Sequence, residues 1–177
     1  MNGSDRNIRF EEVVLPHLDA GYNLARWLTG NEHDAEDVVQ EACVRAFRFI
    51  EQCRSETARP WLLSIVRNTC FTWLKRNRPN APHVLLDDLE WELEDGAAQP
   101  GLAALQKCEA ETVRKALEEL PAEFREILVL REFEGLAYKE IADVIETPVG
   151  TVMSRLARAR RRLHQALLPS QTIEPRP

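Results

Sequence analysis

The stretch from Thr147 to Leu167 limits the possible folds of this chain more than any other segment. Apolar residues recur in it at every third or fourth position, a spacing that places them along one face of a helix. Thr147 is a good helix cap, and Pro148 suits the first helical position, where a missing N–H costs nothing. The core-facing residues of the predicted helix are Val149, Val152, Leu156, Ala159, Leu163 and Leu167.

The opposite side of this predicted helix is basic. Between Gly150 and Arg162 there are five arginines and no acidic residue, in a chain of formal net charge −6. The alternative is a solvated face on an ordinary amphipathic helix, but a basic run without one balancing acid is unusual in an acidic protein. The pattern favours DNA as the partner. The residues predicted to face it are Thr151, Ser154, Arg155, Arg158 and Arg162.

A second, shorter helix is predicted just upstream, from about Ala137 to Ile145. Two short helices joined by a tight turn at Glu146 describe a helix-turn-helix unit, which places the N-terminal half of its second helix in the major groove. Arginines there reach guanine edges or phosphates, and hydroxyls bond to either. Ala137 has no hydroxyl, so Glu140 supplies only half of a capping box.

Length and composition narrow the protein class. A chain of 177 residues with 44% hydrophobic residues forms one large or two small globular domains. Because neither a membrane-length apolar run nor an apolar signal segment is present, we expect a cytoplasmic protein without membrane insertion. The cysteines are widely spaced and the histidines do not cluster, which predicts neither a metal site nor a disulfide framework. Buried reduced thiols are favoured and redox sensing is the alternative for Cys43, Cys53, Cys70 and Cys108.

Helical periodicity dominates the N-terminal part, and the predicted fold class is all-α. One helix spans residues 10–29, is interrupted near Pro16 and is ended by Gly30. The next begins at Asp34 as its cap, with Asp37 in the first turn. Its predicted buried face is Val38, Val39, Ala42, Cys43, Ala46, Phe49 and Ile50, and its predicted exposed stripe is Asp37, Gln40, Glu41, Val44 and Arg48.

After a polar loop over 51–57, Pro60 opens another predicted helix. Its core face is expected to be Leu62, Ile65, Val66, Thr69 and Trp73. The other side mixes cations, an amide and an aromatic ring, a combination that suits single-stranded DNA. Basic residues are also favoured at any helix C-terminus, which is the alternative explanation. The residues of this side are Arg67, Asn68, Phe71, Thr72, Lys75 and Arg76.

A domain boundary follows. Residues 79–101 contain three prolines, two glycines and six acidic residues, with no lysine or arginine, which is typical of a flexible linker. We therefore predict two small helical domains joined by a flexible acidic linker. Their expected bounds are 1–78, the linker 79–101, a second domain 102–168 that contains the helix-turn-helix, and a disordered tail 169–177.

Three segments carry a resemblance to a known family. They are D-A-E-D-V-V-Q-E-A from Asp34, W-L-L-S-I-V-R-N from Trp61, and a second-domain run that starts L-P-A-E-F-R-E-I-L and ends P-V-G-T-V-M-S-R-L-A-R-A-R-R-R-L. In this order, with an acidic linker between them, they resemble the extracytoplasmic-function (ECF) sigma factors of the bacterial sigma-70 family. The resemblance covers nearly the whole chain. It implies a protein that binds core RNA polymerase, recognises promoter DNA at two elements, helps to open it, and is held inactive by an anti-sigma factor.

The resemblance also implies roles for particular residues. It implies no catalytic residue, cofactor or small-molecule substrate. The loop over 51–59 resembles the family loop that receives a flipped-out base, and the acidic linker resembles the segment that threads the RNA path of the polymerase. The implied sites are Asp37, Gln40, Glu41 and Val44 for the polymerase; Arg67, Asn68, Phe71, Thr72, Lys75 and Arg76 for the minus-ten element; and Thr151, Ser154, Arg155, Arg158 and Arg162 for the minus-thirty-five element.

Three positions depart from the family pattern. Many relatives have an acid in place of Thr72, a cation in place of Met153 and a hydroxyl residue in place of Ala137. The first two departures concern which promoter sequence is read. Since each domain leaves a functional surface exposed, we expect the free chain to be extended and an anti-sigma complex to be compact.

Two other protein classes compete with this interpretation. A stand-alone helix-turn-helix regulator would need a ligand pocket, a phosphoacceptor site or a dimer helix, and the sequence indicates none of them. An enzyme would need a constellation of reactive groups. The acids Asp34, Glu36, Asp37 and Glu41 are not accompanied by an E-x-x-H pair of a helical carboxylate site.

Overall fold

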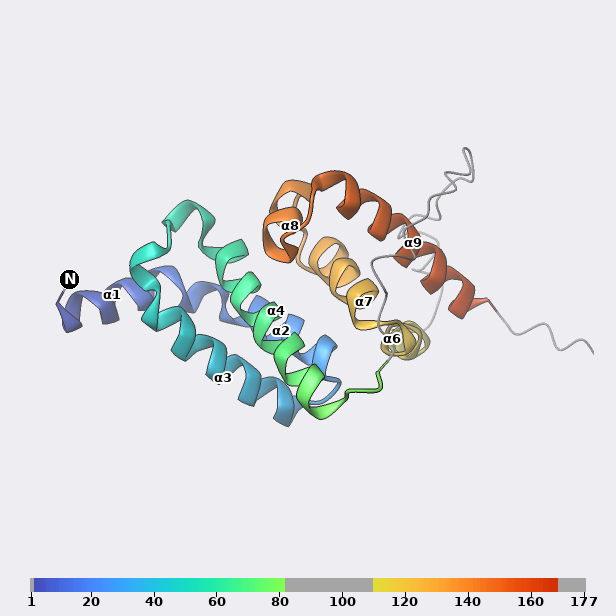
Figure 1. Ribbon diagram of the computed structural model, residues 1–177, viewed down its shortest axis with the longest axis horizontal. Helices are drawn as coiled ribbons and strands as arrows, with labels where there is room; N and C mark the ends of the chain where they lie inside the picture. Colours follow the sequence, from blue (N-terminus) through green and yellow to red (C-terminus); the bar gives the residue numbers. More distant parts are fainter. Residues whose placement is uncertain (1, 82–109, 169–177) are drawn as a thin grey trace, which may run out of the picture.

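The computed structural model describes residues 2–81 and 110–168. Every element within these two ranges is helical, which confirms the all-α fold class, and the helices form two bundles (Figure 1). Most of the predicted acidic linker, the predicted start of the second domain at Leu102 and the predicted disordered tail lie outside the described residues. Within the described ranges, no helix is both long and apolar enough to cross a membrane.

The first bundle is built on three packed helices, α2 (Leu18–Thr29), α3 (Glu32–Arg48) and α4 (Ala58–Asn77). Leu24, Leu28 and Leu62 are fully buried where these helices meet. Gly21 allows a close helix crossing, since a Cβ at that position would lie 3.2 Å from Cγ2 of Val66. The elements are α1 (Gly3–Val13), η1 (Leu15–His17), α2 (Leu18–Thr29), α3 (Glu32–Arg48), η2 (Ile50–Gln52), η3 (Ser55–Thr57) and α4 (Ala58–Asn77).

Helix boundaries in this bundle follow local chemistry. The predicted break near Pro16 is confirmed as the 3-10 turn η1, and α2 ends at Gly30, whose φ of 87° is left-handed. The predicted cap of α3 is wrong: the cap is Asn31, whose side chain accepts a hydrogen bond from the Asp34 N–H at 2.8 Å. The helix starts earlier because an asparagine three residues upstream already satisfies that N–H.

The predicted faces of α3 and α4 are largely as expected. In α3, Val38, Ala42 and Ala46 are buried, but the prediction for Phe49 is wrong, because its side chain is 50% exposed. Phe49 is the C-cap residue, where the backbone leaves the helical path and no longer holds a side chain on the buried stripe. In α4 the predicted core residues are buried or packed against the core: Leu62, Ile65, Val66, Thr69 and Trp73.

The second bundle holds the helix-turn-helix. α7 continues into a π-helical turn, η5, that ends before Gly135 (φ 67°). Ile141 and Val144 of α8 are fully buried, and Glu146 makes the predicted tight turn in a left-handed conformation (φ 53°). The elements are α6 (Ala110–Glu119), α7 (Ala122–Leu128), η5 (Val129–Phe133), α8 (Tyr138–Ile145) and α9 (Val149–Leu167).

The start of α9 differs from the prediction. Pro148, not Thr147, is the N-cap residue, and the Thr147 hydroxyl donates to the Ile145 carbonyl at 3.0 Å. Val149, expected in the core, is 40% exposed because it occupies the first helical position, beyond the edge of α8. The rest of the predicted stripe is buried, apart from the half-buried Leu167.

The two bundles pack against each other. α4 lies against α8, and α2 lies against α7 (Figure 1). The Arg59 guanidinium donates to the Glu134 carboxylate at 2.8 Å, and the Asn23 amide donates to the same carboxylate at 2.7 Å. The expectation of an extended free chain therefore differs from the structure. Faces that look solvent-exposed in each domain alone carry polar groups that satisfy one another across the interface.

Candidate polymerase and nucleic-acid interfaces

The stripe predicted to bind polymerase lies on the solvent side of α3. Asp37, Gln40, Glu41 and Val44 are all exposed, and the Val44 side chain is 50% exposed. Glu41 forms an ion pair with Arg45, one turn further along the helix. An exposed aliphatic side chain among acids and an amide is a surface that a protein partner can bury while its cations pair with the acids.

The face of α4 predicted to bind the minus-ten element is only partly exposed to solvent. Asn68, Lys75 and Arg76 are exposed, whereas Phe71 and Thr72 are half-buried. The Thr72 hydroxyl donates to the backbone carbonyl of Asn68 at 2.9 Å, an i−4 bond that occupies its proton. The sixth predicted residue of this face, Arg67, turns toward the second bundle.

Arg67 binds a buried carboxylate of α7. Its Nε donates to Oε2 of Glu126 at 2.7 Å, and a terminal guanidinium nitrogen donates to Oε1 at 3.1 Å. The guanidinium also lies 4.4 Å from the centre of the Phe71 ring. Burial favours a lower pKa for Arg67, but the hydrogen bond and charge of Glu126 outweigh it and raise the pKa. Arg67 therefore stays charged while it is held inside the molecule.

Glu126 joins the two predicted DNA-binding surfaces. Its side chain is fully buried, and a nitrogen of Arg155 lies 3.9 Å from Oε1, the oxygen to which Arg67 also donates. Burial raises the pKa of Glu126, and the two guanidinium groups oppose that shift. One residue predicted to read the minus-ten element and one predicted to read the minus-thirty-five element thus share one carboxylate.

The predicted DNA face of α9 needs correction. All five of its residues were expected on an exposed side, but Ser154 is 6% exposed and Arg155 is 9% exposed. Arg155 is adjacent to Leu156 of the apolar stripe, and α9 packs against α7, which carries its partner Glu126. The Ser154 hydroxyl instead donates to the Thr151 carbonyl of its own helix at 2.8 Å. Thr151 and Arg158 are half-buried and Arg162 is exposed, with the guanidinium of Arg162 lying 5.0 Å from the centre of the Phe124 ring.

Glu126, Glu134 and Arg125 make contacts between the two bundles that the sequence did not predict. Arg125 donates to the carbonyls of Leu117, Glu118 and Leu120, and also to that of Trp27 in the first bundle, at 2.7–2.9 Å. In the sequence these residues look like the polar side of an amphipathic helix. The available signal was their dense apolar surroundings, A-E-F-R-E-I-L-V-L, which leave little room for a solvated side.

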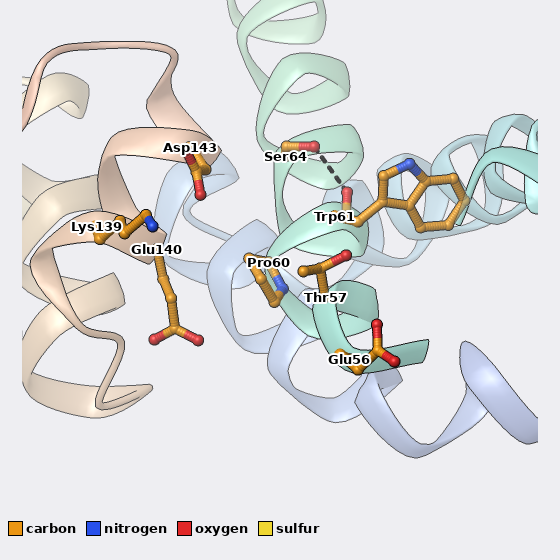
Figure 2. Close-up of a pocket in the computed structure, with 8 residues that line it drawn as sticks. All are labelled: Glu56, Thr57, Pro60, Trp61, Ser64, Lys139, Glu140 and Asp143. Atoms are coloured by element: carbon orange, nitrogen blue, oxygen red, sulfur yellow. Dashed lines mark hydrogen bonds between the residues drawn. The ribbon is translucent and has the colours of Figure 1, made fainter. Parts of the chain in front are cut away.

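A groove of about 460 Å³ opens between η3 and the start of α4 on one side and α8 on the other (Figure 2). The indole ring of Trp61 points away from the α8 residues (Figure 2). Acidic groups outnumber basic ones in the lining, so the groove disfavours phosphate. In this arrangement, the loop expected to receive a flipped-out base faces an acidic helix. The charged lining residues are Glu56, Lys139, Glu140 and Asp143.

The cysteines in the described ranges are free thiols. Cys53 and Cys70 are buried and Cys43 is half-buried, whereas Cys108 lies outside the described residues. Burial raises the pKa of all three described thiols, which lowers their reactivity. The part of the chain that the structure describes contains no group of three or more His, Cys, Asp or Glu side chains able to hold a metal ion.

Each of the two bundles matches a known protein-family model. Residues 13–79 match the model of sigma-70 region 2, and residues 110–163 match that of sigma-70 region 4. The RNA polymerase sigma-H factor of Pseudomonas aeruginosa is 36% identical over 167 residues, which cover 90% of this chain and 86% of that protein. The ECF RNA polymerase sigma-E factor of Escherichia coli K12 is 36% identical over 143 residues, covering 77% of this chain and 75% of that protein. This chain belongs to the ECF sigma factors.

Two solved structures resemble this sigma factor over most of its length. The sigma factor RpoE of Bartonella quintana, solved in complex with the anti-sigma factor NepR, matches with a TM-score of 0.66 and 28% identity, covering 89% of this chain and 96% of that chain. CnrH, solved in complex with the cytosolic domain of CnrY, matches with a TM-score of 0.63 and 27% identity, covering 89% and 86%. Both similarities span the two bundles of the ECF sigma factor.

Proposed function

We propose that this sigma factor binds core RNA polymerase in the cytoplasm and directs it to promoters of a stress or signal regulon. It recognises a minus-ten and a minus-thirty-five element, takes part in initiation without catalysing a reaction, and is held inactive by an anti-sigma factor. The observation that carries this proposal is the order of the two family matches in one chain, with region 2 before region 4. The similar sigma factor RpoE, solved in complex with the anti-sigma factor NepR, supports the anti-sigma partner.

We assign the surfaces as follows. Residues 1–78 act as the region 2 domain, 79–101 as the acidic linker and 102–168 as the region 4 domain. The exposed α3 stripe contacts polymerase, and the α4 face contacts the melted minus-ten strand once Arg67 leaves Glu126. Thr151, Arg158 and Arg162 contact the minus-thirty-five duplex, and Arg155 joins them only if it leaves Glu126.

Run-off transcription with reconstituted polymerase on a genomic fragment library tests the function itself. The expected result is a set of transcripts that appears only when the full chain is added to core polymerase. A stand-alone regulator, the alternative, binds duplex DNA without polymerase and does not co-purify with it. Absence of any chain-dependent transcript would contradict the proposal.

The polymerase contact is tested by charge reversal on α3. The double variant Asp37→Lys, Glu41→Lys should bind core polymerase more weakly. Like or unpaired charges at an interface make the binding free energy less favourable by roughly several kcal/mol. The matched control is Glu11→Lys, Glu12→Lys on α1, which makes the same charge change at exposed positions outside the stripe. Equal recovery of polymerase by both double variants in a pull-down would contradict the assignment.

Promoter opening is tested on α4. Replacing Asn68 and Phe71 by alanine should leave polymerase binding intact and impair melting, because base stacking is worth about 1–3 kcal/mol per base. Permanganate reactivity of thymines in the open complex is the measurement. The same reactivity in variant and wild type would show that this face does not hold the melted strand.

A further inference from the structure

The exposed side of α9 is apolar near its N-terminus. Val149 is 40% exposed and Met153 is 53% exposed, and since they are four residues apart they lie side by side on the helix. Gly150 is exposed beside them, and a Cβ there would meet no atom within 4 Å. We call Val149, Gly150 and Met153 the apolar tip. It lies in the half of the second helix that a helix-turn-helix unit places in the major groove.

Two of the polar residues expected to read bases from this half, Ser154 and Arg155, are already bonded inside the domain. The Ser154 hydroxyl donates to the Thr151 carbonyl at 2.8 Å. Arg155 is nearly buried and faces Glu126. The apolar tip is therefore the most exposed part of the first turns of α9, and it stays open although the two bundles are packed together.

The charge around the apolar tip indicates its occupant. Arg161 and Arg162 are exposed about two turns beyond Met153, and α9 contains no acidic residue. A protein partner that buried this tip would also have to supply acids for these cations. Duplex DNA supplies them as phosphates on either side of a groove. The apolar group that the major groove offers is the C5 methyl of thymine.

We propose that Val149 and Met153 read thymine methyl groups in the minus-thirty-five element. The inference rests on the proposed function and names the base that this sigma factor prefers. Recognition comes from removing methyl groups from water, so it discriminates against cytosine and uracil at the contacted positions without a hydrogen bond. Arg161 and Arg162 hold the helix on the phosphates and contribute equally to every sequence.

Thymine methyl groups can be removed one at a time. The probe is a duplex that carries the minus-thirty-five element of a promoter recovered by run-off transcription, with each thymine replaced in turn by deoxyuridine. Holoenzyme assembled from the full chain should bind about fourfold more weakly at one or two of these positions, the equivalent of one methyl group returned to water. Met153→Ala should bind the thymine duplex more weakly and show no further loss with deoxyuridine at the position that Met153 contacts.

Three further variants separate the loss of methyl contacts from other effects on DNA binding. Leu168→Ala removes an apolar side chain of similar exposure at the C-cap of α9, far from the apolar tip, and it should keep the wild-type preference for thymine. Arg161→Ala should weaken binding to the thymine and deoxyuridine duplexes equally. Met153→Arg should bind the thymine duplex and the duplex with deoxyuridine at the Met153 position equally, with a salt dependence steeper by about one phosphate.

Several results would overturn the inference. The wild-type holoenzyme could bind the thymine and deoxyuridine duplexes equally well. Met153→Ala could keep the full wild-type preference for thymine. The minus-thirty-five element of the recovered promoter could contain no thymine. A loss of polymerase or anti-sigma binding in Met153→Ala with DNA binding intact would assign the apolar tip to a protein partner instead. Absence of any run-off transcript would contradict the proposed function, which is a different outcome from transcription without methyl discrimination.

Discussion

At the scale of single residues, buried charges organise this protein. Arg125 and Glu126 are adjacent in sequence but serve different contacts. Arg125 donates to carbonyls at the C-terminal end of α6, where few backbone N–H groups are available, and to one carbonyl of the first bundle. Glu126 accepts a hydrogen bond from Arg67 of the other bundle. Charges buried in this way are stable only while their partners remain in place.

Thiol reactivity tests the burial of one residue. Burial raises the pKa of Cys70, so only a small fraction is the reactive thiolate at pH 8. In a Cys108→Ser background, Cys43 should react first with an aromatic disulfide reagent, and Cys70 should react only on the timescale of unfolding. Mass spectrometry of the labelled peptides distinguishes them. Native-state labelling of Cys70 as fast as that of Cys43 would contradict its position in the core.

Backbone strain in the helix-turn-helix is also a property of one residue. Glu146 has a φ of 53°, a conformation that costs a non-glycine residue about 1 kcal/mol or more. Glu146→Gly should therefore raise the free energy of unfolding by about 0.5–1 kcal/mol. Glu146→Val, which is β-branched, should lower it. Chemical denaturation of both variants is the measurement, and a less stable glycine variant would show that the Glu146 side chain matters more than its backbone.

At the scale of elements, helix ends decide which surface each helix presents. The α8 N-cap residue Ala137 has an extended backbone (φ −67°, ψ 155°), and its N–H donates to the Glu140 carboxylate at 2.7 Å. This is the half capping box that the sequence predicts. The missing half leaves an N–H of the first turn of α8 without a side-chain acceptor from its cap residue.

Completing this capping box should stabilise α8. Ala137→Ser places a hydroxyl at an exposed position whose backbone is already extended, and the expected gain in the free energy of unfolding is about 1 kcal/mol. Thermal denaturation measures it. Glu140→Gln with Ala137→Ser should keep most of the gain, because the hydroxyl acts alone. A serine variant no more stable than wild type would mean that solvent already satisfies this end of the helix.

At the scale of the whole molecule, packing of the two bundles covers residues that are proposed to bind DNA. Arg67 is bound to Glu126, and the groove beside η3 is lined by acids of α8. The proposed contact of Arg67 with the melted minus-ten strand therefore requires the bundles to separate at Glu126. The predicted compact anti-sigma complex is compatible with this arrangement, but compactness is already a property of the chain alone.

Removing the charge of Glu126 tests this closure. Glu126→Gln leaves Arg67 and Arg155 facing a neutral group, and loss of one partner of a buried pair costs about 3–5 kcal/mol. We expect a larger radius of gyration in small-angle scattering, with helical content retained in circular dichroism. Glu111→Gln removes a carboxylate from an exposed ion pair and serves as the control. Identical scattering curves for wild type and Glu126→Gln would show that other contacts hold the bundles together.

The sequence by itself determined the helices, the break at Pro16, the turn at Glu146 and the exposed stripe on α3. These features depend on the 3.6-residue repeat and on local backbone chemistry, which operate within one segment. Sequence motifs also indicated the ECF sigma factor family, since such motifs contain the residues of surfaces that bind the partners of a family. The assignment of minus-ten and polymerase residues remains a prediction.

Only the tertiary structure decided which polar residues are covered. Arg67 and Arg155 look solvent-exposed along their own helices, yet Glu126 draws both inward, because a buried carboxylate is stable only with cations beside it. Val149 and Phe49 fit apolar stripes but lie at helix ends, beyond the reach of a covering helix. A helical repeat defines the faces of one helix, whereas burial depends on which other helix covers each face.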